Sequence, residues 1–437
     1  MAIVFLLVAL LSPLPAFALQ PLEVFVASAR ERNPDALEAK ANLAQQSAQA
    51  DAALGRVLPG ISARGSYTRN QYGVQLDLPP APGSTTPGSS ITIVPTNQWD
   101  GSATLTVPLI DAAGWARAAS AGTGAHAADW QLASTRLLVE GQVAQGYYQL
   151  VADLALATAS RRALDVSRES LRLAESRYQA GVGTVLEVDR ARADVELQTQ
   201  QVAAADLQVA LAVRALESAS NVRPDVSTAA PLADDLHAEP PLSAFEGDLG
   251  RLPAVAAAAE NTHAADYQVR AQRFALLPSI AGTFSERGTT SPGFVGHNWS
   301  WQAVLVATWS FDLTNVANIH GQSAAADVAR ARELRVRLQT RDAIHRQWET
   351  VAAAIARSRS ARAGRAAASH AAQQAHDRYQ AGTITQLDLL QAQRDAFTAD
   401  VARIQADADL INARAQLRVA AGETLLEAAG PHPLSPQ

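Results

Sequence analysis

The sequence contains no cysteine and only one lysine, Lys40. The absence of cysteine excludes disulfide bonds, thiolate metal sites, cysteine nucleophiles and a lipid anchor on an N-terminal cysteine. Almost all of the positive charge is therefore carried by arginine, and the net charge of the chain is -6 at pH 7. Because nucleic-acid-binding proteins present a basic face, this charge balance argues against a nucleic-acid partner.

Long apolar runs are also rare. One run, IVFLLVALL at Ile3–Leu11, has the length of a signal-peptide core, and AFA at Ala16–Ala18 has the pattern of a cleavage site. Residues 1–18 are therefore predicted to be a signal peptide. No later stretch has the roughly 20 uncharged apolar residues that a membrane-spanning helix needs. We expect an exported protein that enters a membrane, if it does so, as β-strands.

Sequence motifs of catalysis and metal binding are missing as well. There is no glycine-rich phosphate loop and no G-x-S-x-G elbow. His370 and His376 are six positions apart, whereas a helical zinc pair has its histidines four apart. The sequence therefore predicts no catalytic residue, no cofactor site, no metal site and no enzyme.

The sequence contains an internal duplication. RYQAG occurs at Arg177–Gly181 and again, 201 positions later, at Arg378–Gly382. The same offset relates TLTVPLID to LVATWSFD, and an offset of 219 relates VLPGI to LLPSI; the difference is an insertion that contains PPAPGSTTPGSS. We expect five parts: a signal peptide (1–18), a first repeat (19–220), a linker (221–241), a second repeat (242–421) and a C-terminal tail (422–437).

Two segments of each repeat have the alternation of β-strands. Apolar and polar residues alternate from Trp99 to Leu109 and from Trp299 to Phe311, and more weakly over Ile61–Tyr67 and Ile280–Ser285. Runs of about ten alternating residues with aromatic side chains near their ends are typical of lipid-facing barrel strands. A half-buried strand of a soluble sheet alternates in the same way, so the pattern alone leaves both interpretations open.

Very long helices follow the strands. Residues 112–180 and 313–381 contain no proline, and each segment would be about 100 Å long as one helix. The return segments carry apolar residues at sevenfold spacing, which indicates packing between neighbouring helices. These residues are Val188, Val195, Val202, Val209 and Leu216, and Leu390, Phe397, Ile404 and Ile411. Asp111 and Asp312 are predicted N-caps of the long helices. The fold class is mainly α with a small β part.

Four strands of this length cannot close a barrel, because the smallest membrane barrels have about eight. An open sheet in hydrocarbon would leave unpaired N–H and C=O groups on two edges, at several kcal/mol for each group. Copies of the chain are therefore expected to share one barrel. The number of strands does not distinguish two copies from three.

These residues and their spacing resemble the TolC family of outer-membrane efflux proteins. The resemblance rests on the two RYQAG motifs, on TVLEVDRARADVE and TITQLDLLQAQRD after them, and on VPLID and WSFD at the strand ends. It implies a homotrimer with a 12-strand barrel in outer-membrane lipid, continued by a periplasmic α-helical barrel. It also implies a passive exit duct of a tripartite efflux or type I secretion system, opened by a periplasmic adaptor protein and an inner-membrane pump.

The repeated motif has a structural and a functional interpretation. Gly181 and Gly382 are placed to end long helices, and Thr184 with Glu187 and Thr385 with Asp388 have the spacing of capping boxes. The resemblance implies in addition that these turns form the tip that meets the adaptor. The expected contact residues are Arg177, Tyr178, Gly181, Arg378, Tyr379 and Gly382.

Two further groups of residues are candidates for function. The resemblance implies that Glu187 and Asp388 lie near the pore entrance, where a ring of Asp388 carboxylates would attract cations. The aromatic residues expected at the membrane interface are Trp99, Trp299, Trp301 and Trp309. The competing hypothesis is a periplasmic coiled-coil adaptor or scaffold with a soluble β domain. It explains the export signal and the sevenfold spacing, but not the tryptophans at the strand ends.

Overall fold

The computed structural model describes residues 19–79, 90–226, 232, 234–292 and 296–426, so the predicted signal peptide lies outside the described residues. The contacts divide the chain into two units. The helical unit holds the residues up to Lys40, Leu132–Ala254 and those from Arg337 onward. The sheet unit holds Ala41–Gln131 and Val255–Val336. Each unit therefore combines segments of both repeats.

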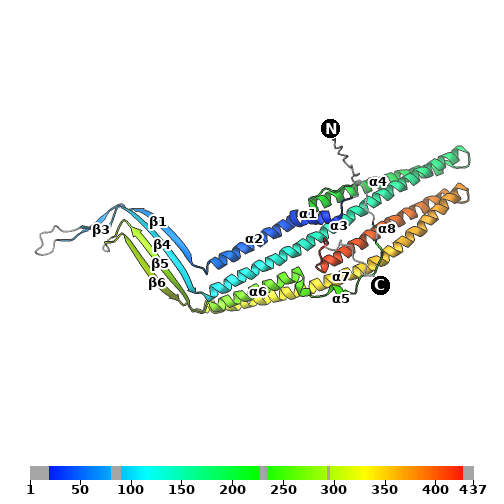
Figure 1. Cartoon of the computed structure of the whole chain (residues 1–437). Coiled ribbons are helices and arrows are strands. Elements are labelled where there is room, and N and C mark those ends of the chain that lie inside the picture. The colour runs from blue at the N-terminus through cyan, green and yellow to red at the C-terminus, as the bar shows by residue number, and fades with distance from the viewer. Residues whose placement is uncertain (1–18, 80–89, 227–231, 233, 293–295, 427–437) are drawn as a thin grey trace, which may run out of the picture. The chain divides into compact units, whose positions relative to one another are not determined.

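The elements follow the duplication (Figure 1). The first repeat contains α1 (Leu22–Arg32), α2 (Pro34–Gly55), β1 (Gly60–Arg69), β2 (Val74–Asp77), β3 (Ser90–Val94), β4 (Asn97–Ile110), α3 (Ala112–Gln179) and α4 (Val185–Ser220). The second contains α5 (Leu242–Phe245), the 3-10 helix η1 (Leu249–Arg251), α6 (Pro253–Phe274), β5 (Ser279–Thr289), β6 (Trp299–Thr308), α7 (Leu313–Gln380) and α8 (Gln386–Ala420). The helices α3 and α7 have 68 residues each and begin 201 positions apart, as predicted.

The sheet unit contains one four-stranded antiparallel sheet in the order β1-β4-β5-β6. Its register places Leu105 beside Ile61 and Phe284, so apolar side chains of neighbouring strands share one face. The opposite face is polar and contains the ion pair between Asp100 and Arg287, with 2.8 Å between Oδ1 and Nη2. The predicted alternation is therefore confirmed for most of the four strands, but Val304 and Val306 of β6 lie on the polar face, and Glu286 of β5 lies beside Trp301 on the apolar face.

The strands differ from the prediction in two places. First, β6 ends at Thr308, and not at Phe311, because Thr308 pairs with Ser279, the first residue of β5; Trp309 and Phe311 have no pairing partner. Second, β2 and β3 form an additional hairpin around the insertion, of which residues 80–89 lie outside the described residues. The turn-rich composition of the insertion gave no strand signal, because strands of four and five residues are too short to show alternation.

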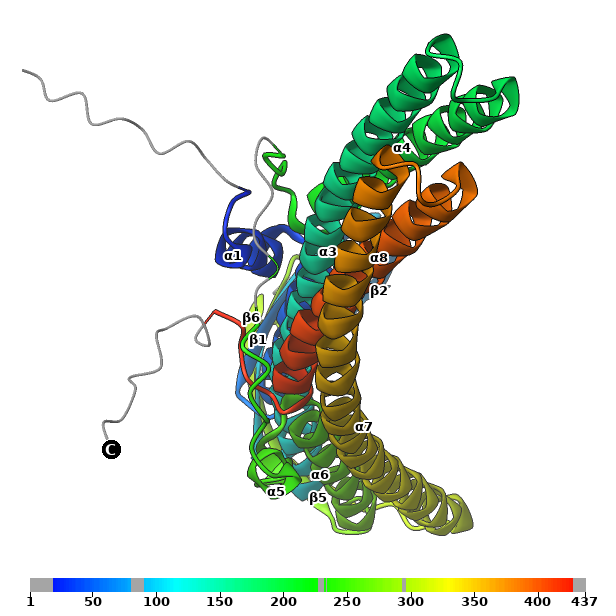
Figure 2. The ribbon, with the colours of Figure 1, turned by 90° about the vertical axis from the view of Figure 1, so that its right-hand side faces the viewer.

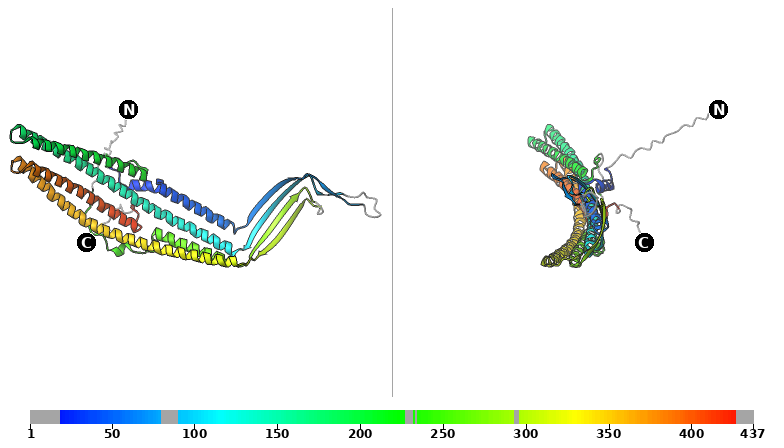
Figure 3. Two further views of the ribbon diagram at one scale, coloured as in Figure 1. Left: turned by 180° about the vertical axis from the view of Figure 1, so that it is seen from behind. Right: turned by 90° about the vertical axis from the view of Figure 1, so that its left-hand side faces the viewer.

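The helical unit is built from two antiparallel hairpins, α3 with α4 and α7 with α8. Across this unit the helices follow one another in the order α4, α3, α8, α7 (Figures 1 and 3). The sevenfold apolar residues face inward, since Val188, Leu216, Leu390 and Ile404 are buried. Between the hairpins, Ala152 and Ala159 of α3 pack against Ile404 and Ala408 of α8. Small alanine side chains therefore allow α3 and α8 to approach closely.

Two aspartates begin the long helices as predicted. Asp111 Oδ1 accepts a hydrogen bond of 2.7 Å from the amide of Gly114, and Asp312 Oδ1 accepts one of 2.8 Å from Asn315. Each is an N-cap that satisfies a free amide of the first helical turn. Among the described residues, no helix has both the length and the apolar character needed to cross a membrane.

The segment between the repeats is held against the last helix by a buried arginine. The Arg414 guanidinium lies 2.9 Å from an Asp234 carboxylate oxygen, and it also bonds to Glu239. The guanidinium donates a hydrogen bond of 2.8 Å to the backbone carbonyl of His237 and one of 2.9 Å to Nε2 of the His237 ring. Asp234, Asp235 and His237 come close enough to share an ion, but the guanidinium of Arg414 already occupies two of these side chains.

Candidate functional site at the hairpin turns

Both hairpins reverse through a glycine with left-handed backbone. The φ angle is 77° at Gly181 and 74° at Gly382. The amides of these glycines donate 3.0 Å bonds to the carbonyls of Tyr178 and Tyr379. An L side chain costs roughly 1–2 kcal/mol in this conformation. The turn prediction for RYQAG is confirmed, and it explains why the glycine is repeated.

The return helices begin with two capping boxes. Thr184 Oγ1 accepts a bond from the amide of Glu187, whose carboxylate accepts one from the amide of Thr184. Thr385 and Asp388 exchange the same two bonds. The hydrogen bond from the Thr385 hydroxyl and that from its amide lower the pKa of Asp388, which therefore carries its negative charge at neutral pH. Asp388 is exposed and stands at the start of α8, where the helix dipole also favours an anion.

The two turns contact each other through Arg177 and Tyr379. The guanidinium carbon of Arg177 lies 4.9 Å from the centre of the Tyr379 ring, and Arg177 Nη1 donates 3.3 Å to the Tyr379 carbonyl. Only 1% of Tyr379 is exposed, and its hydroxyl has no hydrogen-bond partner among the described residues. Burial, together with the nearby Glu187 carboxylate, raises the pKa of the Tyr379 phenol. The phenol is therefore neutral, and the face of its aromatic ring contacts the Arg177 guanidinium in a cation–π interaction.

Among the residues that the structure describes, the matching pair of the other repeat, Arg378 and Tyr178, makes no such contact. Tyr178 is 49% exposed, and Arg378 is exposed. The structure thus brings together Arg177, Tyr379 and Glu187, but leaves Tyr178, Arg378 and Asp388 on the surface. Both turns face the viewer in Figure 2. Of the six residues expected at the adaptor contact, Tyr379 alone is buried. It lies beneath Arg177 and is not itself on the surface.

The seam between the hairpins contains polar contacts that the sequence analysis missed. Arg394 of α8 bonds to Asp194 of α4 at 2.9 Å, and Gln386 Nε2 donates 2.5 Å to the Glu187 carbonyl. Gln393 Nε2 donates 3.0 Å to the hydroxyl of Ser170. Asp194 and Arg394 both lie within the motifs that follow RYQAG, but their pairing joins residues 200 positions apart. No local spacing rule could have revealed it.

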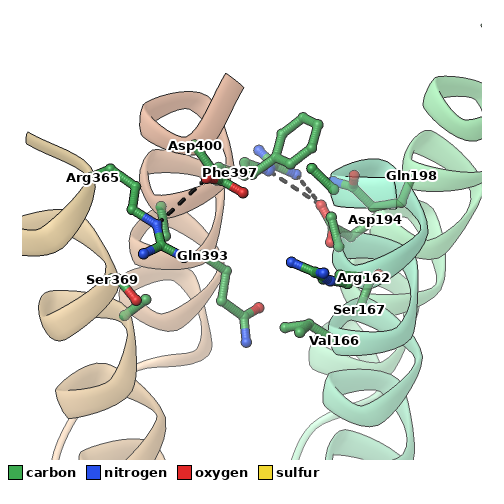
Figure 4. Close-up of a pocket in the computed structure, with 15 residues that line it drawn as sticks. Arg162, Val166, Ser167, Asp194, Gln198, Arg365, Ser369, Gln393, Phe397 and Asp400 are labelled. Atoms are coloured by element: carbon green, nitrogen blue, oxygen red, sulfur yellow. Dashed lines mark hydrogen bonds and ion pairs between the residues drawn. The ribbon is translucent and has the colours of Figure 1, made fainter. Parts of the chain in front are cut away.

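A cavity of about 270 Å³ lies in this seam (Figure 4). Its lining includes the ion pairs Arg394–Asp194 and Arg365–Asp400, at 2.9 and 3.4 Å. The lining also includes Arg162 and the buried Ser167 and Gln198. It contains no histidine, and both of its carboxylates are bound to arginine, so it offers no free general acid or base.

The four tryptophans expected at the membrane interface lie on or just beyond the strands of the sheet unit. Trp99 packs on Tyr67 with 4.8 Å between ring centres, and Trp301 stacks on Phe284 at 6.1 Å. Trp309 follows β6 and donates 3.0 Å to the carbonyl of Leu276. Trp99, Trp299, Trp301 and Trp309 are between 63 and 72% exposed. Large exposed aromatic side chains of this kind mark an apolar surface that contacts a membrane or another protein.

These features can be compared with known proteins. The sequence pattern of the outer membrane efflux protein family matches residues 25–222 and 248–423. The chain belongs to this family. BepC, an outer membrane efflux protein of Brucella suis, is 28% identical over 287 residues, which are 63% of this chain and 61% of BepC. The chain therefore matches less than two thirds of the length of this relative.

Solved structures of outer membrane proteins share the fold. The CmeC outer membrane channel of Campylobacter jejuni has a TM-score of 0.77 at 19% identity, over 92% of this chain and 86% of CmeC. The outer membrane protein VceC of Vibrio cholerae has a TM-score of 0.75 at 18% identity, over 92% of this chain and 96% of VceC. Membership confirms the predicted family, the fold class and the outer-membrane location of this efflux protein. It favours a transport protein, and not an enzyme or a periplasmic scaffold.

Proposed function

We propose that the efflux protein is the exit duct of a tripartite efflux or type I secretion system, formed by three copies of the chain. The duct is passive. A periplasmic adaptor and an inner-membrane pump deliver the solute and open the duct, and the pump supplies the energy.

The observation that carries this proposal is the open sheet. In the described structure, β1 and β6 are edge strands with one neighbour each. The four strands alternate in direction, so β6 of one copy and β1 of the next would run antiparallel and continue the same pattern. Joining copies in this way leaves no edge strand. In lipid, each unpaired N–H or C=O group on an open edge would cost several kcal/mol. Three copies give 12 strands.

The exposed tryptophans support the orientation of this barrel. The apolar face with Trp99, Trp299 and Trp301 would meet the lipid, and the polar face with Asp100 and Arg287 would line the duct. Trp309 lies eight positions after Trp301, which is about 26 Å along an extended chain. Barrel strands tilt by about 35–45°, so this length spans roughly 20 Å of a hydrocarbon core that is about 30 Å thick. The two residues would therefore lie toward opposite interfaces of the membrane.

The hairpin turns are the proposed contact surface for the adaptor. Gly181 and Gly382 are exposed, and Tyr178 and Arg378 flank them on the surface. In the trimer, three Asp388 carboxylates near the entrance would form a cation-binding constriction. The ionised state of Asp388 supports this role, because the hydrogen bonds from Thr385 lower the pKa of its carboxyl group.

Fractionation and mass measurement test the duct. The protein should extract from the outer membrane with detergent, and light scattering should give about three times the protomer mass. The purified protein should conduct ions in a planar lipid bilayer. A monomer in the aqueous periplasmic fraction would contradict the proposal.

A further inference from the structure

The cavity in the seam between the hairpins is lined by all four of their helices. Side chains of α3, α4, α7 and α8 surround it (Figure 4). Its volume of about 270 Å³ is close to the lower limit of the pockets that hold small organic molecules in proteins, which is roughly 300 Å³. The size of the cavity therefore suits a compact organic ligand.

Two buried polar side chains line this cavity without a hydrogen-bond partner. Ser167 is 3% exposed and Gln198 is 5% exposed. Among the described residues, neither the Ser167 hydroxyl nor Oε1 of Gln198 has a partner. Burying a polar group without a hydrogen bond is costly, so such groups usually bind a ligand or an ordered water. A hydroxyl donates or accepts, whereas an amide oxygen only accepts, so a ligand that satisfies Gln198 has an O–H or N–H group.

The charge of the lining favours an anion. Asp194 and Asp400 are already paired with Arg394 and Arg365. The guanidinium of Arg162 also points into the cavity (Figure 4), and among the described residues it has no carboxylate partner. Three guanidinium groups against two carboxylates leave one positive charge unpaired. Because the planar guanidinium group matches the geometry of a carboxylate, Arg162 is suited to bind an anionic group.

Much of the remaining lining is apolar. It consists of Ala159, Ala163, Val166, Ala372, Ala396 and Phe397. Apolar walls with a few convergent polar groups are typical of sites for organic ligands. Free inorganic phosphate is polar on every side and would leave these walls without a matching surface. The lining therefore favours an anion that has an apolar part.

The other repeat has alanine at the three polar positions that have no partner. At the offset of 201, Arg162, Ser167 and Gln198 correspond to Ala363, Ala368 and Ala399. The helices of the other repeat form with these alanines, and alanine has the highest helix propensity. The three polar side chains are therefore not needed to form the repeated helices. They occur only in the repeat whose residues at these positions line the cavity.

We propose that this cavity binds a small organic anion. The anionic group lies on the Arg162 guanidinium, the apolar part packs against Phe397, and a hydroxyl or amide group of the ligand donates to Gln198 Oε1. The Ser167 hydroxyl supplies a further hydrogen bond to the ligand. All of these residues belong to one chain, so the site does not depend on the proposed duct.

Ligand-observed NMR of the purified full-length protein in detergent tests the site. The probe is mandelate, which has a carboxylate, a phenyl ring and a hydroxyl group. Phenylacetate lacks only the hydroxyl, and 2-amino-1-phenylethanol keeps the ring and the hydroxyl but is a cation. Mandelate should bind with a Kd on the order of 1 mM, phenylacetate about fivefold more weakly, and the cation not detectably. Equal binding of anion and cation, or no binding of mandelate because water alone fills the cavity, would overturn the proposal.

Substitutions locate the bound anion. Arg162→Gln should weaken the binding of both anions about tenfold, because it removes a charged hydrogen-bond donor. Gln198→Ala should weaken mandelate about fivefold and leave phenylacetate unchanged, since only mandelate has the hydroxyl that donates to Gln198. The control is Arg161→Gln, because Arg161 pairs with Asp206 at 2.6 Å and lies outside the lining. Equal losses in the two arginine variants, or equal losses of both probes in Gln198→Ala, would overturn the assignment.

Discussion

The guanidinium of Arg414, near the end of the last helix, lies 2.9 Å from the carboxylate of Asp234, in the segment that joins the repeats. Both side chains are less than a tenth exposed. Replacing both partners of a buried ion pair with apolar residues often changes the free energy of unfolding little. Removing only one partner leaves an uncompensated charge in the interior and destabilises the fold. This pair therefore holds the linker against α8, the second helix of the second hairpin. We expect its loss to lower the stability of the whole helical unit.

Arg414→Ala should destabilise the protein strongly. Breaking a buried ion pair of this kind costs about 3–5 kcal/mol. The measurement is thermal or chemical unfolding of the purified protein, and proteolysis near residue 237 should become faster. The control is Arg357→Ala, because Arg357 is 67% exposed and pairs with Asp409 at 3.5 Å. Surface pairs contribute about 0–1 kcal/mol, so equal losses in the two variants would contradict a special role for Arg414.

Bulky side chains at both Gly181 and Gly382 should leave trimers in the outer membrane but abolish efflux. Each glycine has a positive φ angle, and nothing lies within 4 Å of a Cβ atom added there. Leucine therefore strains the turn and also protrudes at the proposed adaptor surface. Asparagine tolerates the left-handed conformation and tests protrusion without most of the strain. Drug-susceptibility assays measure efflux.

The control for these glycine variants is Gly364→Ala. Gly364 lies inside α7, and nothing lies within 4 Å of its added Cβ either. Alanine is the better helix former by about 1 kcal/mol, so this variant should be at least as stable as the wild type. Normal resistance with leucine at both turns would remove the docking role.

Asp388→Asn should weaken block of the channel by multivalent cations. Asparagine keeps the hydrogen bond that caps α8, but it removes the charge of the proposed constriction. Because the hydrogen bonds from Thr385 lower the pKa of Asp388, the wild-type block should persist at neutral pH and fade as acid protonates this carboxylate. Single-channel recordings with a trivalent cation measure the effect. Unchanged block in this variant would leave Asp388 with the capping role alone.

Tyr147→Phe should make the protein more resistant to alkali. Burial raises the pKa of Tyr147 to about 12, and its ring packs 5.8 Å from that of Phe25. The usual tyrosine pKa is about 10. Because the folded value is the higher one, the neutral phenol favours the folded state at every pH below 10. This contribution is lost as the pH rises from about 10 to about 12.

Phenylalanine keeps the packing and has no proton to lose, so the loss of stability over this pH range should be smaller in the variant. Unfolding measured between neutral pH and pH 12 provides the test. The control is Tyr72→Phe, because Tyr72 is 74% exposed. An identical pH profile for Tyr147→Phe and the wild type would show that burial of this phenol does not govern alkaline stability.

The sequence by itself determined the features that depend on local chemistry. A left-handed glycine ends each long helix, a threonine and an acid begin each return helix, and Asp111 and Asp312 cap the long helices. Each of these devices needs only residues within about five positions of one another, so the residue types reveal them directly. The alternation of the four main strands could be predicted for the same reason, and the duplication could be predicted because its two copies align directly in the sequence.

Only the tertiary structure decided how the two repeats differ. Tyr178 and Tyr379 have identical neighbours in RYQAG, yet one is exposed and the other is buried under Arg177. The pairing of Arg394 with Asp194 and of Arg414 with Asp234 likewise joins residues about 200 positions apart. Burial and ion pairing depend on which helices become neighbours. Two identical motifs therefore acquire different environments when one faces the partner hairpin and the other faces outward.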